Sequence, residues 1–148
     1  MDFKFRKVRD IQDIFVAGKK FAYLADRKLS YKDLETLPVM CLEGNTSTRA
    51  YVEGFLRENG VHLQPEFELA TSDMLIRFAM RGFGIAGVAE DFALEAMEKG
   101  EIFRLHFDRE IPKRHFCIVT DEKVPMTAAA RRFLDLLEDK CTHDKHKT

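Results

Sequence analysis

The sequence predicts an α/β fold with a central, largely parallel sheet. Three short apolar runs, at 39–42, 67–70 and 85–88, are each followed by a helical pattern, at 48–59, 72–81 and 90–99. Strands that alternate with helices over such brief connections are joined by right-handed crossovers and form mostly parallel sheets. Hydrophobic residues make up 45% of the 148 residues, including 13 Phe, so we expect a real core.

The N-terminal part predicts two strands before this alternation begins. Phe3 and Phe5 alternate with charged residues, and an apolar run follows at 14–17. Residues 19–28 are expected to form a loop. A capping-box spacing that starts at Ser30 predicts one helical turn after that loop.

The stretch 70–90 contains a glycine pattern that resembles a nucleotide-binding motif. A helix is expected to begin at Thr71 or Ser72, which are suitable N-caps, and to end at Gly82. Gly82, Gly84 and Gly87 satisfy G-x-G-x-x-G. In a dinucleotide-binding turn, however, the glycines follow a strand and open a helix. Here they follow a helix, so we predict that they end it and let the next strand pack closely.

The C-terminal part predicts two more strands and a last helix. The strands are expected at 102–107 and 115–120, and Thr127 is expected to open the helix. This helix has an apolar stripe that must be buried against something. The stripe consists of Ala130, Phe133, Leu134 and Leu137. Residues 140–148 are polar and predicted to be a disordered tail.

Composition and charge exclude several classes of protein. The net charge is -1, so there is no overall basic field for nucleic acid, and the local cluster of Arg6, Lys7 and Arg9 is read as a solvated strand face. No apolar run is long enough to cross a bilayer, and the N-terminus lacks the apolar core of a secretory signal. The chain is therefore expected to be cytoplasmic.

The cysteines do not form a redox or zinc pattern. Cys41 and Cys117 lie in apolar runs and are expected to be buried, inert thiols. Cys141 lies near His143 and His146, but a mobile tail is the preferred interpretation over a metal site. We expect neither a metal nor a cofactor.

Hydroxyl and amide side chains gather where two predicted strands lead into helices. In open parallel sheets, ligands bind outside the carboxyl ends of the strands. The loops there are 43–48, 70–73 and 89–91, and the helix N-termini that they precede favour a carboxylate or another small anion. The predicted ligand-binding residues are Asn45, Thr46, Ser47 and Thr48 in the first loop and Thr71 and Ser72 in the second.

Catalytic patterns are poor by comparison. The sequence contains no nucleophile elbow, no H-E-x-x-H and no Walker loop. His62, His106 and His115 have no spacing that ties them to a carboxylate and a nucleophile, so they are read as structural. Glu43 or Glu90, beside the proposed ligand, could act as an acid or base, an alternative that the sequence leaves open.

Five segments in order resemble the effector-binding domain of LysR-type transcriptional regulators. The resemblance covers about residues 11–138, and its most specific parts are the helix before the G-x-G-I-A strand and the last helix. The segments are LPVMCLE from Leu37, TSTR from Thr46, ATSD from Ala70, RGFGIAGV from Arg81 and AARRFL from Ala129.

The resemblance implies a periplasmic-binding-protein-like fold of type II, in which two α/β subdomains close on a small effector. Most of this chain would be one Rossmann-like subdomain with a central mixed, largely parallel sheet. The implied division is 1–19 for the end of the first subdomain and a hinge strand, 20–118 for the second subdomain, 119–139 for the return hinge and last helix, and 140–148 for the tail. Hydroxyl groups at helix N-termini hold the effector in this family, and Thr46, Ser47, Thr48 and Thr71 match them.

The resemblance also implies a non-enzymatic function, namely sensing a small, anionic effector. The winged helix-turn-helix of the family, through which DNA would be bound, is not in this sequence, and neither are the opening elements of the first subdomain. We therefore expect the C-terminal portion of an effector-binding domain, which forms a homodimer or higher assembly through Phe133 and Leu137. We expect no membrane partner.

Two alternatives belong to other classes. An enzyme on a similar fold, such as a dehydratase of aromatic amino-acid synthesis, would need Thr-Arg-Phe where this chain has Thr48, Arg49 and Ala50. A transport-type solute-binding protein would need an export signal.

Overall fold

The computed structural model describes residues 2–143, with side chains up to Glu138. The chain forms two compact units. One comprises the residues up to Ile11 together with those from Arg114 onward, and the other is Gln12–Lys113. The larger unit contains the predicted alternation of strands and helices.

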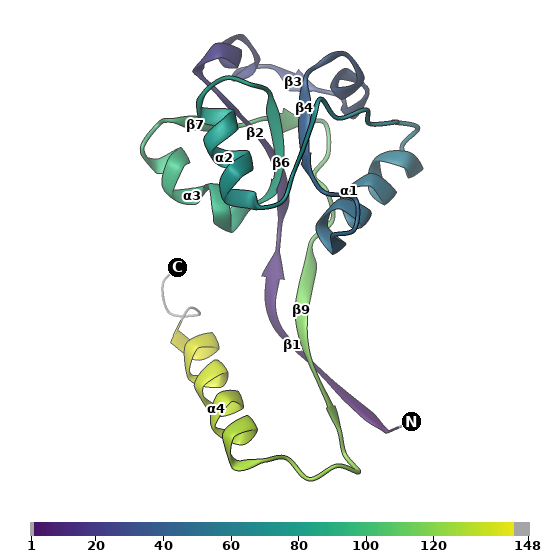
Figure 1. Cartoon of the computed structure of the whole chain (residues 1–148), viewed down its shortest axis with the longest axis vertical. Helices are drawn as coiled ribbons and strands as arrows, with labels where there is room; N and C mark the ends of the chain where they lie inside the picture. Colours follow the sequence, from purple (N-terminus) through teal and green to yellow (C-terminus); the bar gives the residue numbers. More distant parts are fainter. Residues whose placement is uncertain (1, 144–148) are drawn as a thin grey trace. The chain divides into compact units, whose positions relative to one another are not determined.

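The larger unit is built on a five-stranded mixed sheet in the order β5-β4-β6-β2-β7 (Figure 1). β4 pairs in parallel with both β5 and β6, whereas β2 is antiparallel to both β6 and β7. Four strands therefore run in one direction and only β2 is reversed, so the predicted largely parallel sheet is confirmed. The strands are β2 (Asp13–Gly18), β4 (Val39–Leu42), β5 (Phe67–Leu69), β6 (Ile85–Ala89) and β7 (Ile102–Arg104).

Helices cover both faces of this sheet. α1 (Ser47–Glu58) lies on one side in Figure 1, and α2 (Ser72–Met80) and α3 (Glu90–Glu98) lie on the other. Successive side chains of a strand point to opposite faces. Accordingly, Phe15 of β2 belongs to the core under α1, whereas Ile14 and Val16 belong to the core under α2 and α3.

The glycines after α2 have the structural role predicted for them. Gly82 adopts a positive φ of 76°, and its N–H donates to Ala79 O at 3.0 Å, which ends the helix. At Gly84 a Cβ atom would lie 2.5 Å from the backbone oxygen of Pro38. Only glycine lets β6 approach β4 so closely, and the nucleotide-binding interpretation is not needed.

Short elements differ from the expectations. The predicted loop at 19–28 contains a 3-10 helix, η1 (Lys19–Leu24), and ends in β3 (Lys28–Leu29). The predicted strand at 102–107 is divided into β7 and β8 (His106–Phe107), because β8 leaves the main sheet and pairs in parallel with β3. The capping box of Ser30 is present and opens η2 (Tyr31–Thr36).

The smaller unit contains a two-stranded ribbon and the last helix. β1 (Phe3–Ile11) is antiparallel to β9 (Arg114–Asp121), and α4 (Ala128–His143) follows the N-cap Thr127. Because α4 extends to His143, it includes the first residues of the segment predicted as a disordered tail. Residues 144–148 of that tail lie outside the described residues.

The prediction of two buried thiols is wrong for Cys117, which is exposed on β9. A two-stranded ribbon has only one partner for each strand, so an apolar run in it need not be covered. Cys41 is buried as predicted, and burial raises the pKa of its thiol to about 11. The side chains of Cys141, His143 and His146 are outside the described part of the chain.

Candidate functional site

Three loops that lead into helices meet at one edge of the sheet. β4, β5 and β6 are parallel, so their carboxyl ends lie at the same edge. The loops after β4 and β5 are also joined directly, because the N–H of Glu43 donates to Leu69 O at 3.1 Å. The N-termini of α1 and α2 therefore open onto neighbouring positions, as the topology predicts.

The hydroxyl of Thr46 already donates and accepts a hydrogen bond within the protein. It accepts the N–H of Arg49 at 3.2 Å as the N-cap of α1, and it donates to Glu43 O at 3.0 Å. A hydroxyl has a single hydrogen. Thr46 therefore has no hydrogen left for a ligand while this loop conformation is maintained.

Thr71 is less committed. Its hydroxyl accepts the N–H of Met74 at 3.3 Å as the N-cap of α2, and among the described residues nothing accepts the hydroxyl hydrogen. The side chains of Asn45 and Ser47 are exposed and that of Ser72 is half-buried, and none of the three hydrogen-bonds to a described residue. Thr48 is half-buried in the first turn of α1. The six predicted residues thus lie on the two joined loops, and they differ in which donors are available.

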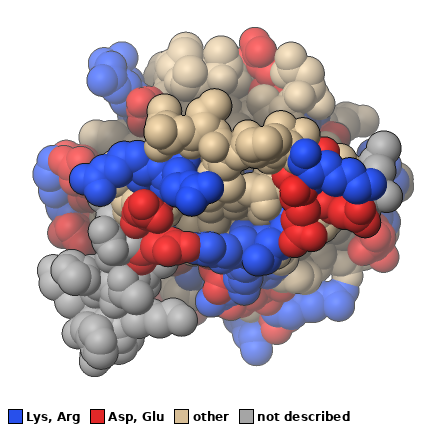
Figure 2. Space-filling view, turned by 90° about the horizontal axis from the view of Figure 1, so that it is seen from below, with Lys and Arg blue, Asp and Glu red and all other residues tan. Residues whose placement is uncertain are grey.

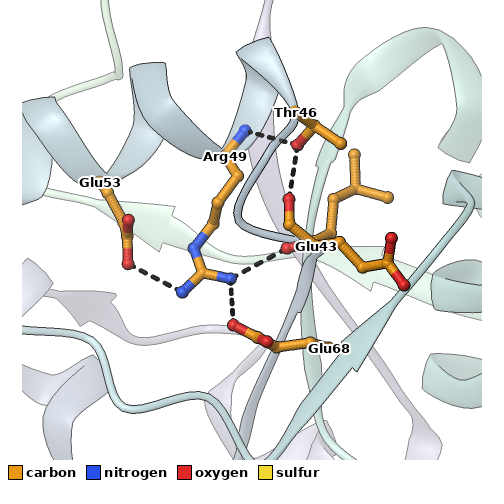
Figure 3. A network of polar contacts seen from close by, with 6 residues as sticks. Glu43, Thr46, Arg49, Glu53 and Glu68 are labelled. Atoms are coloured by element: carbon orange, nitrogen blue, oxygen red, sulfur yellow. Dashed lines mark hydrogen bonds and ion pairs between the residues drawn. The ribbon is translucent and has the colours of Figure 1, made fainter.

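A buried arginine ties these loops together. Arg49, 8% exposed, donates through Nη1 to Leu42 O at 2.9 Å and to Glu68 Oε1 at 2.8 Å (Figure 3). Its Nη2 donates to Glu53 Oε1 at 2.8 Å. One guanidinium thus connects α1 to the ends of β4 and β5.

The two carboxylates determine the electrostatics of this network. Burial disfavours the charge of Arg49, but the hydrogen bonds that it donates to Glu53 and Glu68 and the negative charge nearby outweigh this effect, so the pKa of the guanidinium is raised. Its Nε is buried and has no hydrogen-bond partner among the described residues. This network is not among the sites that the sequence predicts. The spacing of Arg49 and Glu53, which places them one helical turn apart, was the available signal.

Metal-ligating side chains do not cluster in the described part of the chain. No three His, Cys, Asp or Glu side chains among the described residues are arranged to hold a metal ion. His62, His106 and His115 are exposed and lie apart in the chain, His62 in the loop after α1, His106 in β8 and His115 in β9. Glu90 is held by Arg104, whose Nη1 lies 2.9 Å from its Oε1.

The surface charges are mixed. On the face shown in Figure 2, basic and acidic side chains lie beside one another and form no single-sign patch. The basic residues near the N-terminus are partly paired: Arg6 lies against Glu138, and Lys7 Nζ lies 2.6 Å from Asp10 Oδ1. This pattern fits the expected solvated strand face.

The comparison with protein families agrees with the fold. The LysR substrate binding domain family matches residues 2–142. The chain belongs to this family. Its members are effector-binding regulatory domains of a non-enzymatic class of transcription regulators, which excludes the dehydratase-like alternative. A comparison with curated proteins gave no significant match.

Solved structures of LysR regulatory domains have the same fold at low sequence identity. The regulatory domain of Synechocystis PCC6803 CcmR in complex with 2-PG has a TM-score of 0.80 at 17% identity, covering 93% of this chain and 66% of that domain. The effector-binding domain of QuiR in complex with shikimate has a TM-score of 0.78 at 10% identity, covering 98% and 67%. The bromide-bound regulatory domain of Salmonella typhimurium HypT has a TM-score of 0.74 at 15% identity, covering 97% and 66%. The chain thus spans about two thirds of each of these domains.

None of the helices in the described residues is both long enough and apolar enough to cross a bilayer.

Proposed function

We propose that this LysR effector-binding domain senses a small anionic molecule at the joined loops after β4 and β5. The observation that carries the proposal is the convergence of two helix N-termini, linked by the Glu43-to-Leu69 hydrogen bond, at one edge of the sheet. Free N–H groups and the positive end of the helix dipole favour an anion at such a place. The complexes of CcmR with 2-PG and of QuiR with shikimate lend support, since related domains hold small molecules.

The available donors rank the predicted residues. Thr71, Ser47 and Ser72 can donate a hydroxyl hydrogen, and Asn45 can donate its amide, without breaking a bond to a described residue. Thr46 cannot, because its hydrogen is bound to Glu43 O. Thr71 is the N-cap of α2, and its hydroxyl hydrogen is available, so we assign the direct contact to Thr71. We treat Thr46 as the residue that maintains the conformation of the first loop.

Calorimetry with shikimate as the probe tests this assignment. Thr71→Val should weaken binding by about tenfold or more, since a hydrogen bond to a charged group contributes roughly 1.5–3 kcal/mol. Thr36→Val is the matched control, because Thr36 is an exposed threonine whose hydroxyl donates only to Asp33 O. Equal affinity of the Thr71→Val variant and the unaltered chain would refute the site.

The proposal extends to the complete regulator. Residues 20–118 would act as the second effector-binding subdomain, and the first and last segments would belong to the first subdomain. Effector binding would then alter DNA contacts made by a helix-turn-helix outside these 148 residues. The regulator would work in the cytoplasm, where its DNA target is found.

We also propose that the chain self-associates through its smaller unit. On α4, Phe133 and Leu136 are 61% and 47% exposed, and on the ribbon Phe5 and Phe116 are 69% and 62% exposed. Leu137, which the sequence analysis grouped with Phe133, is half-buried. Several exposed aromatic side chains in one small unit are typical of a surface that a partner covers. Sedimentation velocity should show a dimer or larger species that Phe133→Ser weakens, and a monomer at high concentration would contradict this proposal.

A further inference from the structure

The larger unit contains a cavity that shares no residue with the joined loops. Its volume is about 200 Å³, and it lies where β2 begins and β7 ends. The sheet order places β4 and β6 between β5 and β2, and β7 at the far edge. The cavity is therefore at the opposite end of the sheet from the loop after β5.

Aromatic rings form a rigid wall of this cavity. The rings of Tyr31 and Phe107 stack, with centroids 4.2 Å apart and an interplanar angle of 6°. Phe15 meets Phe107 edge-on at 5.7 Å. A cavity of about 150 Å³ lined by apolar side chains is enough to bind benzene, so this one has room for a six-membered ring with one small substituent.

Two long-range hydrogen bonds fix the segment that closes the cavity. The hydroxyl of Tyr31 donates to Arg109 O at 2.8 Å, and the Nε2 of Gln12 donates to Ile111 O at 2.8 Å. The cavity is thus held open by contacts that exist without a ligand, which lowers the cost of ordering on binding.

The polar lining contains two nitrogen groups that make no hydrogen bond or ion pair to a described residue. Among the described residues, the guanidinium of Arg109 has no hydrogen bond or ion pair, and its Cζ lies 5.8 Å from the centroid of Phe55. The imidazole of His106 likewise has no partner in the described part of the chain. Arg104 is occupied by contrast, since Glu90 and Glu110 bind its two terminal nitrogens at 2.9 and 2.7 Å.

The lining charges restrict the ligand to a single negative charge. Asp13 and Glu110 also line the cavity, and Glu110 is paired with Arg104. A monocarboxylate can use the free guanidinium in the bidentate geometry that suits it. A ligand with further negative charge would face the two carboxylates.

We propose that this cavity is a second ligand site, which binds a planar six-membered-ring monocarboxylate with its carboxylate on Arg109 and His106 and its ring on the aromatic wall. The site is independent of the one at the joined loops. A chain with both sites can respond to two different small molecules.

Titration of the 148-residue chain with benzoate, followed by amide chemical shifts and calorimetry, tests this second site. Benzoate should produce saturable shifts in residues 104–111, and the neutral isostere benzamide should bind at least tenfold more weakly. Arg109→Gln should weaken benzoate binding by about tenfold or more. Arg109→Lys keeps the charge but not the planar guanidinium, so its affinity for benzoate should lie between those of Arg109→Gln and the unaltered chain. Arg77→Gln, at an exposed arginine of α2, is the matched control and should bind as the unaltered chain does.

The outcomes separate this proposal from the first one. Thr71→Val should leave the benzoate shifts in 104–111 unchanged if both proposals hold. Two results would overturn the second site without affecting the first. One is that benzoate shifts only residues 43–48 and 70–73. The other is that the Arg109→Gln and Arg109→Lys variants bind benzoate as tightly as the unaltered chain.

Discussion

Replacing Arg49 with methionine tests whether one buried guanidinium holds the loops of the candidate site together. Arg49→Met removes the hydrogen bonds to Leu42 O, Glu53 and Glu68 while keeping a long apolar side chain under α1. The charged hydrogen bond to the carbonyl of Leu42 contributes about 1.5–3 kcal/mol. Glu53 and Glu68 are 30% and 50% exposed, so each of these ion pairs contributes at most about 1 kcal/mol.

The net loss of stability should be smaller than the sum of these contributions. Methionine also removes the buried, unpartnered Nε of Arg49, and replacing a buried charge by an apolar group recovers part of its desolvation cost. We expect Arg49→Met to lower the free energy of unfolding by about 2 kcal/mol. Glu68→Gln should lower it by only about 0.5 kcal/mol, because Arg49 keeps Leu42 O and Glu53.

Urea denaturation followed by circular dichroism measures both values. Arg57→Met is the matched control, since Arg57 is an exposed arginine in the last turn of the same helix, and it should change the free energy of unfolding by less than about 0.5 kcal/mol. An Arg49→Met variant as stable as this control would refute the anchoring role. A Glu68→Gln variant as damaged as Arg49→Met would show that the exposed carboxylate, and not the buried carbonyl, is the anchor.

Three further predictions concern packing and titration in the larger unit. Gly84→Ala should destabilise the fold by about 2 kcal/mol or more, because its Cβ would lie 2.5 Å from Pro38 O. Gly54→Ala, in open space within α1, should instead stabilise the fold by roughly 0.5–1 kcal/mol. Urea denaturation of the two variants checks the direction of each change in the free energy of unfolding. In a Cys141→Ser background, a thiol reagent at pH 8 should label Cys117 quickly and Cys41 only after unfolding. The reason is that Cys41 is buried and the pKa of its thiol is raised to about 11. Equal labelling rates of the two cysteines would contradict this difference in exposure. Burial raises the pKa of Tyr31 from 10.0 to about 12, so Tyr31 ionises first in the unfolded chain. The free energy of unfolding should therefore fall by roughly 2 kcal/mol as the pH rises from 10 toward 12, and Tyr31→Phe should reduce this loss. An identical pH dependence of stability in both proteins would refute the raised pKa of Tyr31.

The sequence predicts the elements whose ends are marked by local chemistry. α2 follows the N-cap Thr71 and ends before Gly82, and both boundaries can be predicted because an N-cap hydroxyl and a glycine at positive φ are each recognisable at a single position. The adjacency of β4 and β5 also follows from the order of strands and helices along the chain. These two facts are enough to place the six candidate residues on neighbouring loops.

What the sequence does not predict depends on partners that lie far away in the chain. The pairing of β3 with β8 joins Lys28 to His106 through two-residue strands that carry no pattern of their own. Arg49 is linked to β5 through Glu68, which no local signal connects to it. The second cavity draws residues from β2, η2 and 104–111, so a linear reading gives no reason to group Tyr31 with Arg109.

The arginine at the candidate site also limits how an anion can be recognised there. Arg49 is buried between two carboxylates, so its positive charge is already compensated before a ligand arrives. Attraction for an anion must then come from N–H groups at the starts of α1 and α2 and from neutral donors such as Thr71. Neutral donors bind strongly only when the acceptor atoms of the ligand are correctly placed, and they give little attraction at long range. Selectivity at this edge of the sheet should therefore follow the placement of oxygen atoms in the effector. The net charge of a ligand should matter more at Arg109, which has no ion-pair partner among the described residues.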